Sequence, residues 1–278
     1  MIDVICLESS LGSQDPAPDT AEAQGLHRAY LDSLVAPMDG MWLSFAQDGR
    51  RRLLQLDGET AGFFVLGDDG ALLQLYVTPT FELRADELFA AVIERHEVTG
   101  AMVSTADPVF LSLALEHQAS IDVHTLLYED RGAVEPPELA GAELVPVEPE
   151  ELEAMAVAQE EALEQDLGDW LRGYLGHLIR RRELFALRRG EELLGTGETR
   201  VADLQPPYVD LGVITMKAFR RQGVASHILS RLKPLCYARD LQPICSTTMG
   251  NLGARKAITR AGFTARHRLL KITFDAPA

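Results

Sequence analysis

Residues 209–225 constrain the fold of this chain more than any other segment. An apolar run over residues 209–216 predicts a strand, and the basic turn after it holds Arg220, Gly223 and Ala225 in the spacing Arg-x-x-Gly-x-Ala. An amphipathic helix is predicted to follow. Glycine lets a ligand approach the backbone closely, and the first helical turn offers free N–H groups and the positive end of the helix dipole. The segment therefore predicts a strand–turn–helix unit with an anion site suited to a pyrophosphate.

This unit resembles the acyl-CoA-binding motif of the GNAT N-acetyltransferases, (Arg/Gln)-x-x-Gly-x-(Gly/Ala). A single glycine turn also fits a plain structural turn, but two further segments carry the resemblance. Residues 210–215, Asp-Leu-Gly-Val-Ile-Thr, are similar to the motif strand of GNAT proteins that read acidic-Ile-Gly-Val-Val-Thr. Asn251-x-x-Ala254, followed by Ala-Gly-Phe at 261–263, is similar to the second signature of the family. The resemblance covers about residues 142–275.

The order of predicted elements in this half is that of a GNAT domain. After a strand at 143–147, a helix starts near Pro149 and a second covers 167–181, where apolar residues recur every three or four positions. A hairpin over 183–201, the motif strand, a helix at 222–238, a strand at 243–247, a helix at 252–260 and a strand at 266–274 follow. We expect an α/β protein of the mixed α+β kind, with a twisted mixed sheet flanked by helices.

The first half repeats this order without the glycine turn. Strands are predicted at 41–45, 52–56, 60–66, 71–79, 100–104 and 123–128, with helices at 85–94 and 108–117. Residues 80–85 contain no glycine and add Glu82, so a pyrophosphate there would meet Cβ atoms and an acid. We expect tandem GNAT-like domains: a degenerate domain at 1–130 that binds no CoA, a Pro- and Gly-rich linker at 131–141 and the GNAT domain at 142–278. An unrelated α+β module is the alternative for the first half.

Composition limits the classes of function. The chain has 278 residues, a charge of −16 and 46% hydrophobic residues. No apolar run is long enough for a membrane helix, no secretory leader is recognisable, and Cys6, Cys236 and Cys245 lack disulfide or zinc spacing. We therefore expect a cytoplasmic protein without a metal site, and neither membrane nor nucleic-acid binding. Residues 1–135 hold 23 acidic and 7 basic side chains, whereas 136–278 hold 19 of each, which leaves the positive field with the predicted phosphate site.

The resemblance implies acetyl-CoA as cosubstrate and assigns its contacts. In the family the motif strand splays from its neighbour, and its backbone pairs with the pantetheine arm; by position these residues are Val213, Ile214 and Thr215. Backbone amides of the turn and first helical residues are expected to take the pyrophosphate, here those of Arg221, Gln222, Gly223, Val224, Ala225 and Ser226. The side chains of Arg220 and Arg221 can reach the pyrophosphate or the 3′-phosphate. Asn251 is expected either to contact the cofactor or to cap the following helix.

Three side chains are candidates for acid–base catalysis. Asp210 matches the acidic position of the motif strand and is the first candidate base, with Glu198 and Tyr208 as weaker ones. Asp210 could instead orient a substrate cation. Many GNAT proteins carry a tyrosine four residues after the alanine of the second signature as acid for the thiolate, but here that residue is Ile258. An acyl-cysteine route through Cys245 is a further alternative.

The resemblance implies an N-acetyltransferase that acts on a primary amine of a small molecule, by direct attack in a ternary complex. A cationic acceptor would suit the acidic first half. One alternative is a non-catalytic acyl-CoA sensor, which Ile258 favours. Another is an acetyltransferase whose first half recruits a protein amine. The sequence does not identify the acceptor, and it is compatible with both a monomer and a homodimer.

Overall fold

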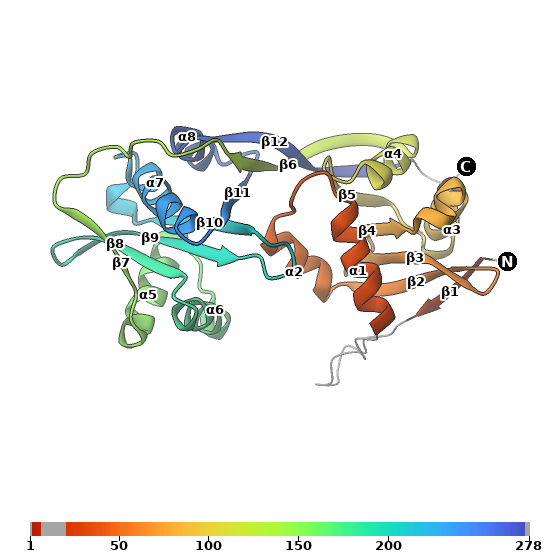
Figure 1. Ribbon diagram of the computed structural model, residues 1–278, viewed down its shortest axis with the longest axis horizontal. Helices are drawn as coiled ribbons and strands as arrows, with labels where there is room; N and C mark the ends of the chain where they lie inside the picture. Colours follow the sequence, from red (N-terminus) through yellow and green to blue (C-terminus); the bar gives the residue numbers. More distant parts are fainter. Residues whose placement is uncertain (1, 7–20, 276–278) are drawn as a thin grey trace. The chain divides into compact units, whose positions relative to one another are not determined.

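The computed structural model describes residues 2–6 and 21–275, and its elements repeat one order twice (Figure 1). The first series is β1 (Ile2–Cys6), α1 (Ala21–Ser33), α2 (Gly40–Asp48), β2 (Arg50–Leu56), β3 (Glu59–Leu66), β4 (Leu72–Val77), the 3₁₀ helix η1 (Pro79–Arg84), α3 (Ala85–His96), β5 (Gly100–Ser104), α4 (Pro108–Glu116) and β6 (Gln118–Asp130). The second series is β7 (Ala142–Pro146), η2 (Pro149–Glu151), α5 (Leu152–Leu163), α6 (Gly168–Arg180), β8 (Leu184–Arg189), β9 (Glu192–Val201), β10 (Tyr208–Thr215), η3 (Lys217–Phe219), α7 (Val224–Tyr237), β11 (Gln242–Thr248), α8 (Leu252–Arg260) and β12 (Phe263–Phe274).

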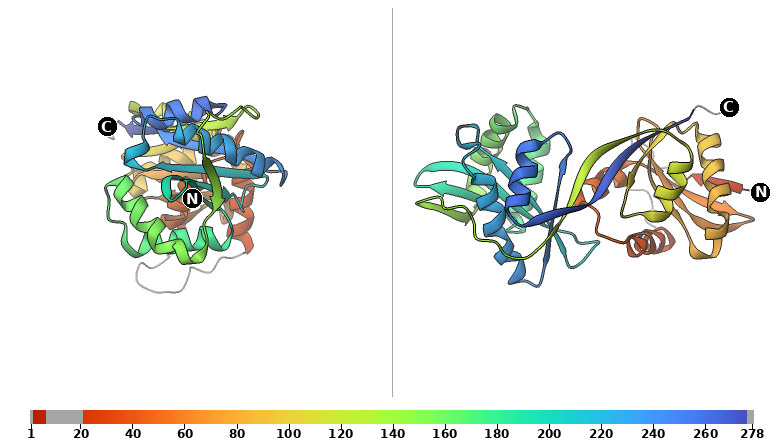
Figure 2. Two further views of the ribbon diagram at one scale, coloured as in Figure 1. Left: turned by 90° about the vertical axis from the view of Figure 1, so that its left-hand side faces the viewer. Right: turned by 90° about the horizontal axis from the view of Figure 1, so that it is seen from above.

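The chain forms two compact units whose boundaries fall inside two long strands. One unit contains Met1–Leu126 and His267–Ala278, and the other contains Leu127–Arg266. The boundaries thus lie within β6 and β12, the yellow-green and blue strands of Figure 2. Residues 267–275 are thus grouped with the first unit, whereas the sequence predicts them to belong to the GNAT domain at 142–278.

The first unit takes its final sheet strand from the C-terminal end of the chain. Its strand order is β1-β2-β3-β4-β5-β12. The second half of β12 pairs antiparallel with β5, from Leu269 opposite Ser104 to Thr273 opposite Gly100. Ile272 and Phe274 of β12 are buried in the same core as β3, β4 and α3. Because side chains alternate along a strand, both residues point to one face of the sheet.

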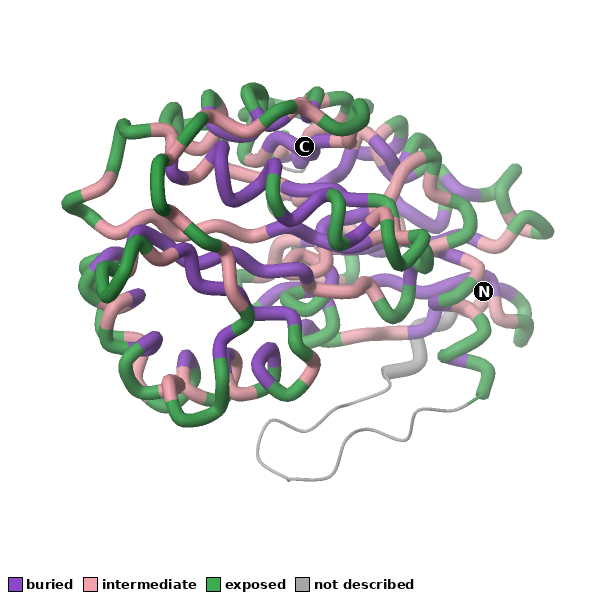
Figure 3. Tube along the Cα trace, turned by 60° about the vertical axis from the view of Figure 1, so that its left-hand side comes forward, coloured by how far each residue is buried: buried purple, intermediate pink, exposed green. Residues whose placement is uncertain are grey.

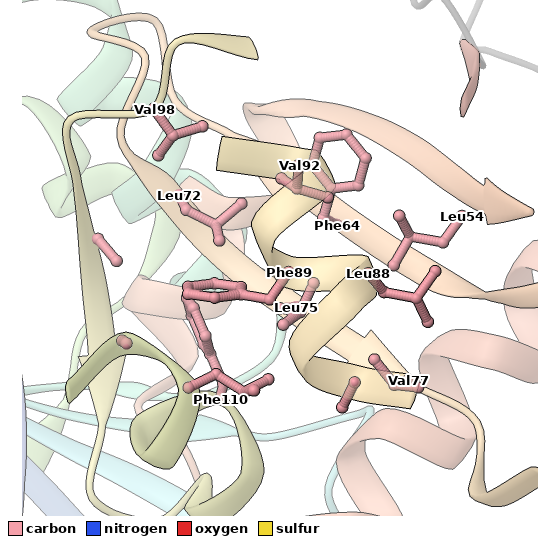
Figure 4. Close-up of a cluster of buried hydrophobic side chains, with 14 of the residues drawn as sticks. Leu54, Phe64, Leu72, Leu75, Val77, Leu88, Phe89, Val92, Val98 and Phe110 are labelled. Carbon is pink, nitrogen blue, oxygen red and sulfur yellow. The ribbon is translucent and has the colours of Figure 1, made fainter. Parts of the chain in front are cut away.

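Apolar side chains cover both faces of the first sheet. On one face, α3 and α4 bury a core that Figure 4 shows in part, with Leu54, Phe64, Leu72, Leu75, Val77, Leu88, Phe89, Val92, Val98 and Phe110. On the other face, Tyr30 of α1 packs against Phe63, Val65 and Tyr76. The Tyr30 and Phe63 rings meet edge to face at 5.8 Å, a favourable arrangement for aromatic pairs.

The second unit has helices on both faces of a sheet with the order β6-β11-β10-β9-β8-β7. Helices α5 and α6 bury Met155, Leu171, Leu175 and Leu178 on one face. Helix α7 lies on the other face, where a Cβ atom at Gly197 would lie 2.5 Å from Ile228. Glycine in β9 therefore permits the close approach of α7. Figure 3 shows buried segments along these strands and on the inner turns of the helices.

The structure bears out most of the predicted helices and strands, but the predicted strand at 41–45 is wrong. These residues lie in α2, whose N-cap Asp39 accepts a hydrogen bond from the backbone N–H of Trp42 at 2.9 Å. A short apolar run fits a strand or a helix equally, and the capping carboxylate decides for the helix. Strand β1 and helix α1 were not predicted.

The predicted linker, residues 131–141, packs along α7 and contains neither helix nor strand up to residue 141. The buried Lys233 of α7 forms an ion pair with Asp130 at 2.5 Å and also binds the carbonyl of Gly132. Further along, the ring of His227 bonds the carbonyl of Pro137 through Nδ1 at 2.7 Å. These contacts lie within the second unit, so the segment is part of that unit rather than a free tether.

Candidate functional site

Strands β10 and β11 separate halfway along β10. They pair in parallel at three positions, from Tyr208 opposite Gln242 to Asp210 opposite Ile244. On its other side β10 stays paired with β9 as far as Thr215. Within the described residues, the part of β10 after Asp210 therefore has one unpaired edge, and it includes the predicted pantetheine-binding residues Val213, Ile214 and Thr215. An extended chain can add to such an edge through its own polar groups.

The turn after β10 adopts left-handed backbone conformations at two residues. Gly223, the N-cap of α7, has φ +87°, and Arg221 has φ +65°. Glycine adopts such an angle readily, whereas an L side chain does so at a cost. The turn is thus built around Gly223, as the motif predicts.

This turn leaves a run of backbone donors unused. In the described part of the chain, the N–H groups of residues 221–226 donate no hydrogen bond to the protein. The first turn of α7 contains no acidic side chain, and the exposed Arg221 lies beside it. Free N–H groups, the helix dipole and a net positive neighbourhood together form an anion site. The residues present fit a pyrophosphate.

Not all predicted phosphate contacts are oriented towards this anion site. The guanidinium of Arg220 donates to the carbonyl of Ala162 at the end of α5, and Lys217 forms an ion pair with Glu164 at 2.8 Å. These two side chains tie the turn to α5. The side chain of Gln222 donates to the carbonyl of Ala218. For these residues the backbone is the part available to a ligand.

A buried polar cluster lies beside the open edge, on the side of the sheet that α5 and α6 cover. Tyr174 of α6 donates its hydroxyl hydrogen to Oε2 of Glu198 at 2.7 Å, and Arg200 binds the same oxygen at 2.6 Å. Glu198 is opposite Gly212 in the register of β9 and β10. A Cβ atom at Gly212 would lie 2.8 Å from Oε2 of Glu198 and 2.9 Å from Nη1 of Arg200. Gly212 therefore makes room for this cluster on β10.

The cluster holds one carboxylate oxygen and leaves the other available. Both bonds to Glu198 reach Oε2, and among the described residues none reaches Oε1, although the side chain is only 7% exposed. Burial, followed by the charge of Glu198, raises the pKa of Tyr174 well above that of a free tyrosine. Tyr174 therefore stays protonated and acts as a donor that orients the carboxylate.

The other two predicted catalytic residues share this side of the sheet. Asp210 is 2% exposed and faces Arg200 across the strands, at the last paired position of β10 and β11. Tyr208, two residues earlier, is half-buried at the start of β10. Alternation along the strand places Tyr208, Asp210 and Gly212 on one face. The fold thus brings Asp210 and Glu198 together near the point where the strands part.

Helix α8 contributes less than the second signature suggests. Asn251 is its N-cap and accepts from the backbone N–H of Ala254 at 3.0 Å, which is the structural role considered for it. Ile258 is 3% exposed and packs in the core, so that position offers no acid. Cys245 is also buried. The acyl-cysteine route therefore lacks an exposed thiol.

Two members of the buried cluster were missed at the sequence level. Tyr174 is one of the residues that recur every three or four positions in the predicted helix at 167–181, and Arg200 has no predicted role in the hairpin at 183–201. The spacing of Glu198 and Arg200 was a usable signal, because residues two apart in a strand share a face. Nothing in the sequence indicated that Tyr174 reaches them.

Comparison with known proteins identifies both halves of the chain. The profile of an acetyltransferase (GNAT) domain matches residues 19–131, and the profile of the acetyltransferase (GNAT) family matches residues 147–263. The second profile covers the open strand edge and the glycine turn. The order of helices and strands in the first half is thus that of a GNAT domain. No curated protein matches the chain.

Solved structures extend the similarity over the full length. An acetyltransferase from the GNAT family of Colwellia psychrerythraea is 32% identical, with a TM-score of 0.88 over 98% of this chain and 100% of its own. A tandem GNAT protein from the clavulanic acid biosynthesis pathway is 16% identical, with a TM-score of 0.61 over 100% of both chains. A GCN5-related N-acetyltransferase from Sphaerobacter thermophilus is 17% identical, with a TM-score of 0.59 over 82% of this chain and 81% of its own.

Two other kinds of site are absent from the described residues. Across residues 2–6 and 21–275, no group of three or more His, Cys, Asp or Glu side chains is placed to hold a metal ion. None of the described helices is both long and apolar enough to span a bilayer. The profiles and the full-length relative carry the assignment: the chain belongs to the GNAT acetyltransferase family and contains two GNAT domains in tandem.

Proposed function

We propose that the protein transfers the acetyl group of acetyl-CoA to a primary amine of a small molecule, by direct attack within a ternary complex. One observation carries the proposal: the open edge of β10 leads into a turn with six unused N–H donors. The open edge suits the pantetheine arm, and the turn suits the pyrophosphate. Acetyl-CoA supplies an activated thioester when it is bound.

The residues beside the open edge suit the acceptor. An amine must lose a proton to act as a nucleophile, and a carboxylate within hydrogen-bond reach can take it directly or through water. Glu198 offers Oε1 on the face where Gly212 makes room for its carboxylate, and Tyr174 and Arg200 fix its orientation. Asp210 on the same face is the alternative base. Since Ile258 is buried, the proton for the leaving thiolate must come from water or from another group.

A screen of primary amines for thiol release from acetyl-CoA tests the proposal. We expect at least one amine to be acetylated, with one acetyl-CoA bound per chain in calorimetry. Initial rates should give intersecting lines when both substrates are varied, whereas a covalent acyl-enzyme would give parallel lines. Binding of acetyl-CoA without turnover of any amine would contradict the proposal.

Two conservative variants separate the candidate bases. Removal of a general base lowers kcat on the order of 10²–10⁴-fold, so Glu198→Gln and Asp210→Asn should differ clearly. The residue that acts as base should lose kcat at unchanged acetyl-CoA affinity, together with the acidic limb of the pH–rate profile. A residue that only binds the substrate cation should raise KM while kcat at saturation stays close to wild type.

The buried Ile258 supports a second candidate, a non-catalytic acyl-CoA sensor. A sensor would need the anion site and the open edge but not an acid on α8 or a base near the acceptor. In that case acetyl-CoA would bind in the same stoichiometry, and Glu198→Gln would change neither binding nor any turnover. Measurable amine acetylation by the wild type would rule the sensor out.

A further inference from the structure

An exposed tryptophan lies next to the buried cluster. Trp170 on the first turn of α6 is 58% exposed, and its ring is stacked on Tyr174 with centroids 5.4 Å apart and planes 4° apart. The apolar positions of α6 that enter the core are Leu171, Leu175, Leu178 and Ile179. Trp170 is not one of them. Its ring is held flat by one tyrosine while much of it faces solvent.

Tyr174 connects this ring to Glu198. One end of the tyrosine supports Trp170, and its hydroxyl donates to Oε2 of Glu198. Tyr174 therefore bridges the exposed indole and the carboxylate of Glu198, whose other oxygen, Oε1, accepts no bond from the described residues. A flat apolar surface and a carboxylate that can accept from a cation thus lie at the two ends of one tyrosine side chain.

We propose that Trp170, Tyr174 and Glu198 form an acceptor subsite for a primary arylalkylamine. This rests on the proposed function. The aromatic ring of the acceptor stacks on the indole, and its ammonium group donates to Oε1 of Glu198, beside the open edge of β10. Trp170 is a specificity-determining residue in this arrangement, and Tyr174 is a positioning residue because it holds both partners.

The charges of the subsite disfavour acceptors that carry a carboxylate. The positive charge of Arg200 is used within the cluster, on Oε2 of Glu198 and on the hydroxyl of Tyr174. Asp210 adds a second carboxylate on the same face. An acceptor with a carboxylate next to its amine would meet two acids, whereas a simple ammonium is favoured. The ammonium group of an aliphatic amine can pair with the carboxylate, but the chain does not stack on the indole, whose face stays exposed to solvent.

Fluorescence tests binding without relying on turnover. The chain has two tryptophans, Trp42 and Trp170, so Trp42→Phe leaves Trp170 as the single indole. With this variant and saturating CoA, titration with 2-phenylethylamine should change the Trp170 emission saturably, and n-hexylamine should change it far less. Glu198→Gln in the same background should weaken the response by about tenfold or more. An unchanged emission with 2-phenylethylamine would overturn the proposal.

Kinetics test specificity. Trp170→Ala should raise KM for 2-phenylethylamine by roughly tenfold at similar kcat and leave n-hexylamine nearly unaffected. Trp170→Phe should restore most of the loss. Phe45→Ala removes another aromatic side chain of similar exposure, 57%, and serves as the matched control. Equal kcat/KM for the two amines in wild type and Trp170→Ala would overturn the subsite while leaving the acetyltransferase proposal intact. A saturable emission change without any acetylation would do the reverse.

Discussion

The two GNAT domains carry the same strand–turn–helix unit in an open and a closed form. In the second unit, β10 leaves β11 after three parallel pairs. In the first unit, β4 and β5 pair in parallel only at Leu72 opposite Ala101. In both, a 3₁₀ helix begins two residues after the strand ends. The divergence of the central strands is therefore a property of the fold and does not by itself make a cofactor site.

The turns that follow are different. In the first unit, η1 runs over six residues directly into α3, and Arg84 is the N-cap. The N–H of Phe81 bonds the carbonyl of Thr78, and that of Ala85 bonds the carbonyl of Glu82. Acidic residues at 82, 86 and 87 add negative charge where the second unit has none. The closed turn uses its donors internally, so an anion has little to bind.

The faces beside the two strands also differ. Compare the residue three positions before the last residue of each strand. In β10 it is Gly212, opposite Glu198, whereas in β4 it is Gln74, opposite Val65. Phe63, Tyr30 and Tyr76 fill the corresponding face of the first unit with aromatic rings. The second unit keeps polar groups and a glycine there. The first domain thus retains the layered fold of the family, but it lacks both the turn with unused N–H donors and the polar cluster beside a glycine.

The largest expected effect is the loss of acetyl-CoA binding in Gly223→Glu. The substitution places a bulky anion in the phosphate site and a side chain at φ +87°, where a Cβ atom also lies 3.5 Å from Pro137. We expect at least about 100-fold weaker binding by calorimetry, equivalent to about 2.7 kcal/mol. Arg84→Glu at the matching N-cap of α3 should have no effect. Two acetyl-CoA molecules per wild-type chain would break the comparison between the units.

The second half of β12 should contribute most to the stability of the first unit. Ile272 is fully buried in its core. Ile272→Ala removes buried methyl groups and should cost about 2–5 kcal/mol of stability, measured by denaturant unfolding. Lys271→Ala, at an exposed neighbouring position, should cost less than about 0.5 kcal/mol. Hydrogen exchange should place the loss in β3, β4 and α3. Loss confined to α5–α8 would show that the strand serves the second unit instead.

The first unit also contains a buried carboxyl group. Burial raises the pKa of Asp107, the N-cap of α4, to about 6, although its Oδ1 accepts the N–H of Phe110. Ionisation is therefore harder in the folded than in the unfolded chain, so stability falls as pH rises from about 4 to about 6. Asp107→Asn keeps the capping oxygen and should stabilise the protein above pH 6 by up to about 3 kcal/mol. The gain should vanish below about pH 4, which a pH series of denaturant unfolding measures.

The smallest effect concerns the missing acid. Ile258→Tyr restores the residue type that the family often has, but at a buried position of α8. We expect a loss of about 1–3 kcal/mol in stability from overpacking and little change in kcat. Thermal unfolding and amine acetylation rates measure the two quantities. Acetylation that appears only in the tyrosine variant would favour the sensor.

Much of the second unit could be predicted from sequence because its signals are local. The turn needs Gly223 for its φ angle, and the strand and helix on either side show their periodicity directly. The same local reasoning predicted that residues 80–85, which contain no glycine and add Glu82, do not form such a turn. It failed at 41–45, where a short apolar run fitted both a strand and a helix until the cap at Asp39 decided.

The sequence by itself determined the order of elements in the second unit, the glycine turn after its motif strand and the lack of that turn in the first half, because each depends on the conformation of a few consecutive residues. Only the tertiary structure decided that the last strand completes the first unit, that Arg220 is bound to α5 and that Tyr174 reaches Glu198 beside Gly212. Those contacts join residues from 24 to about 170 positions apart. Their partners are chosen by the packing of whole sheets and helices, which a local pattern does not encode.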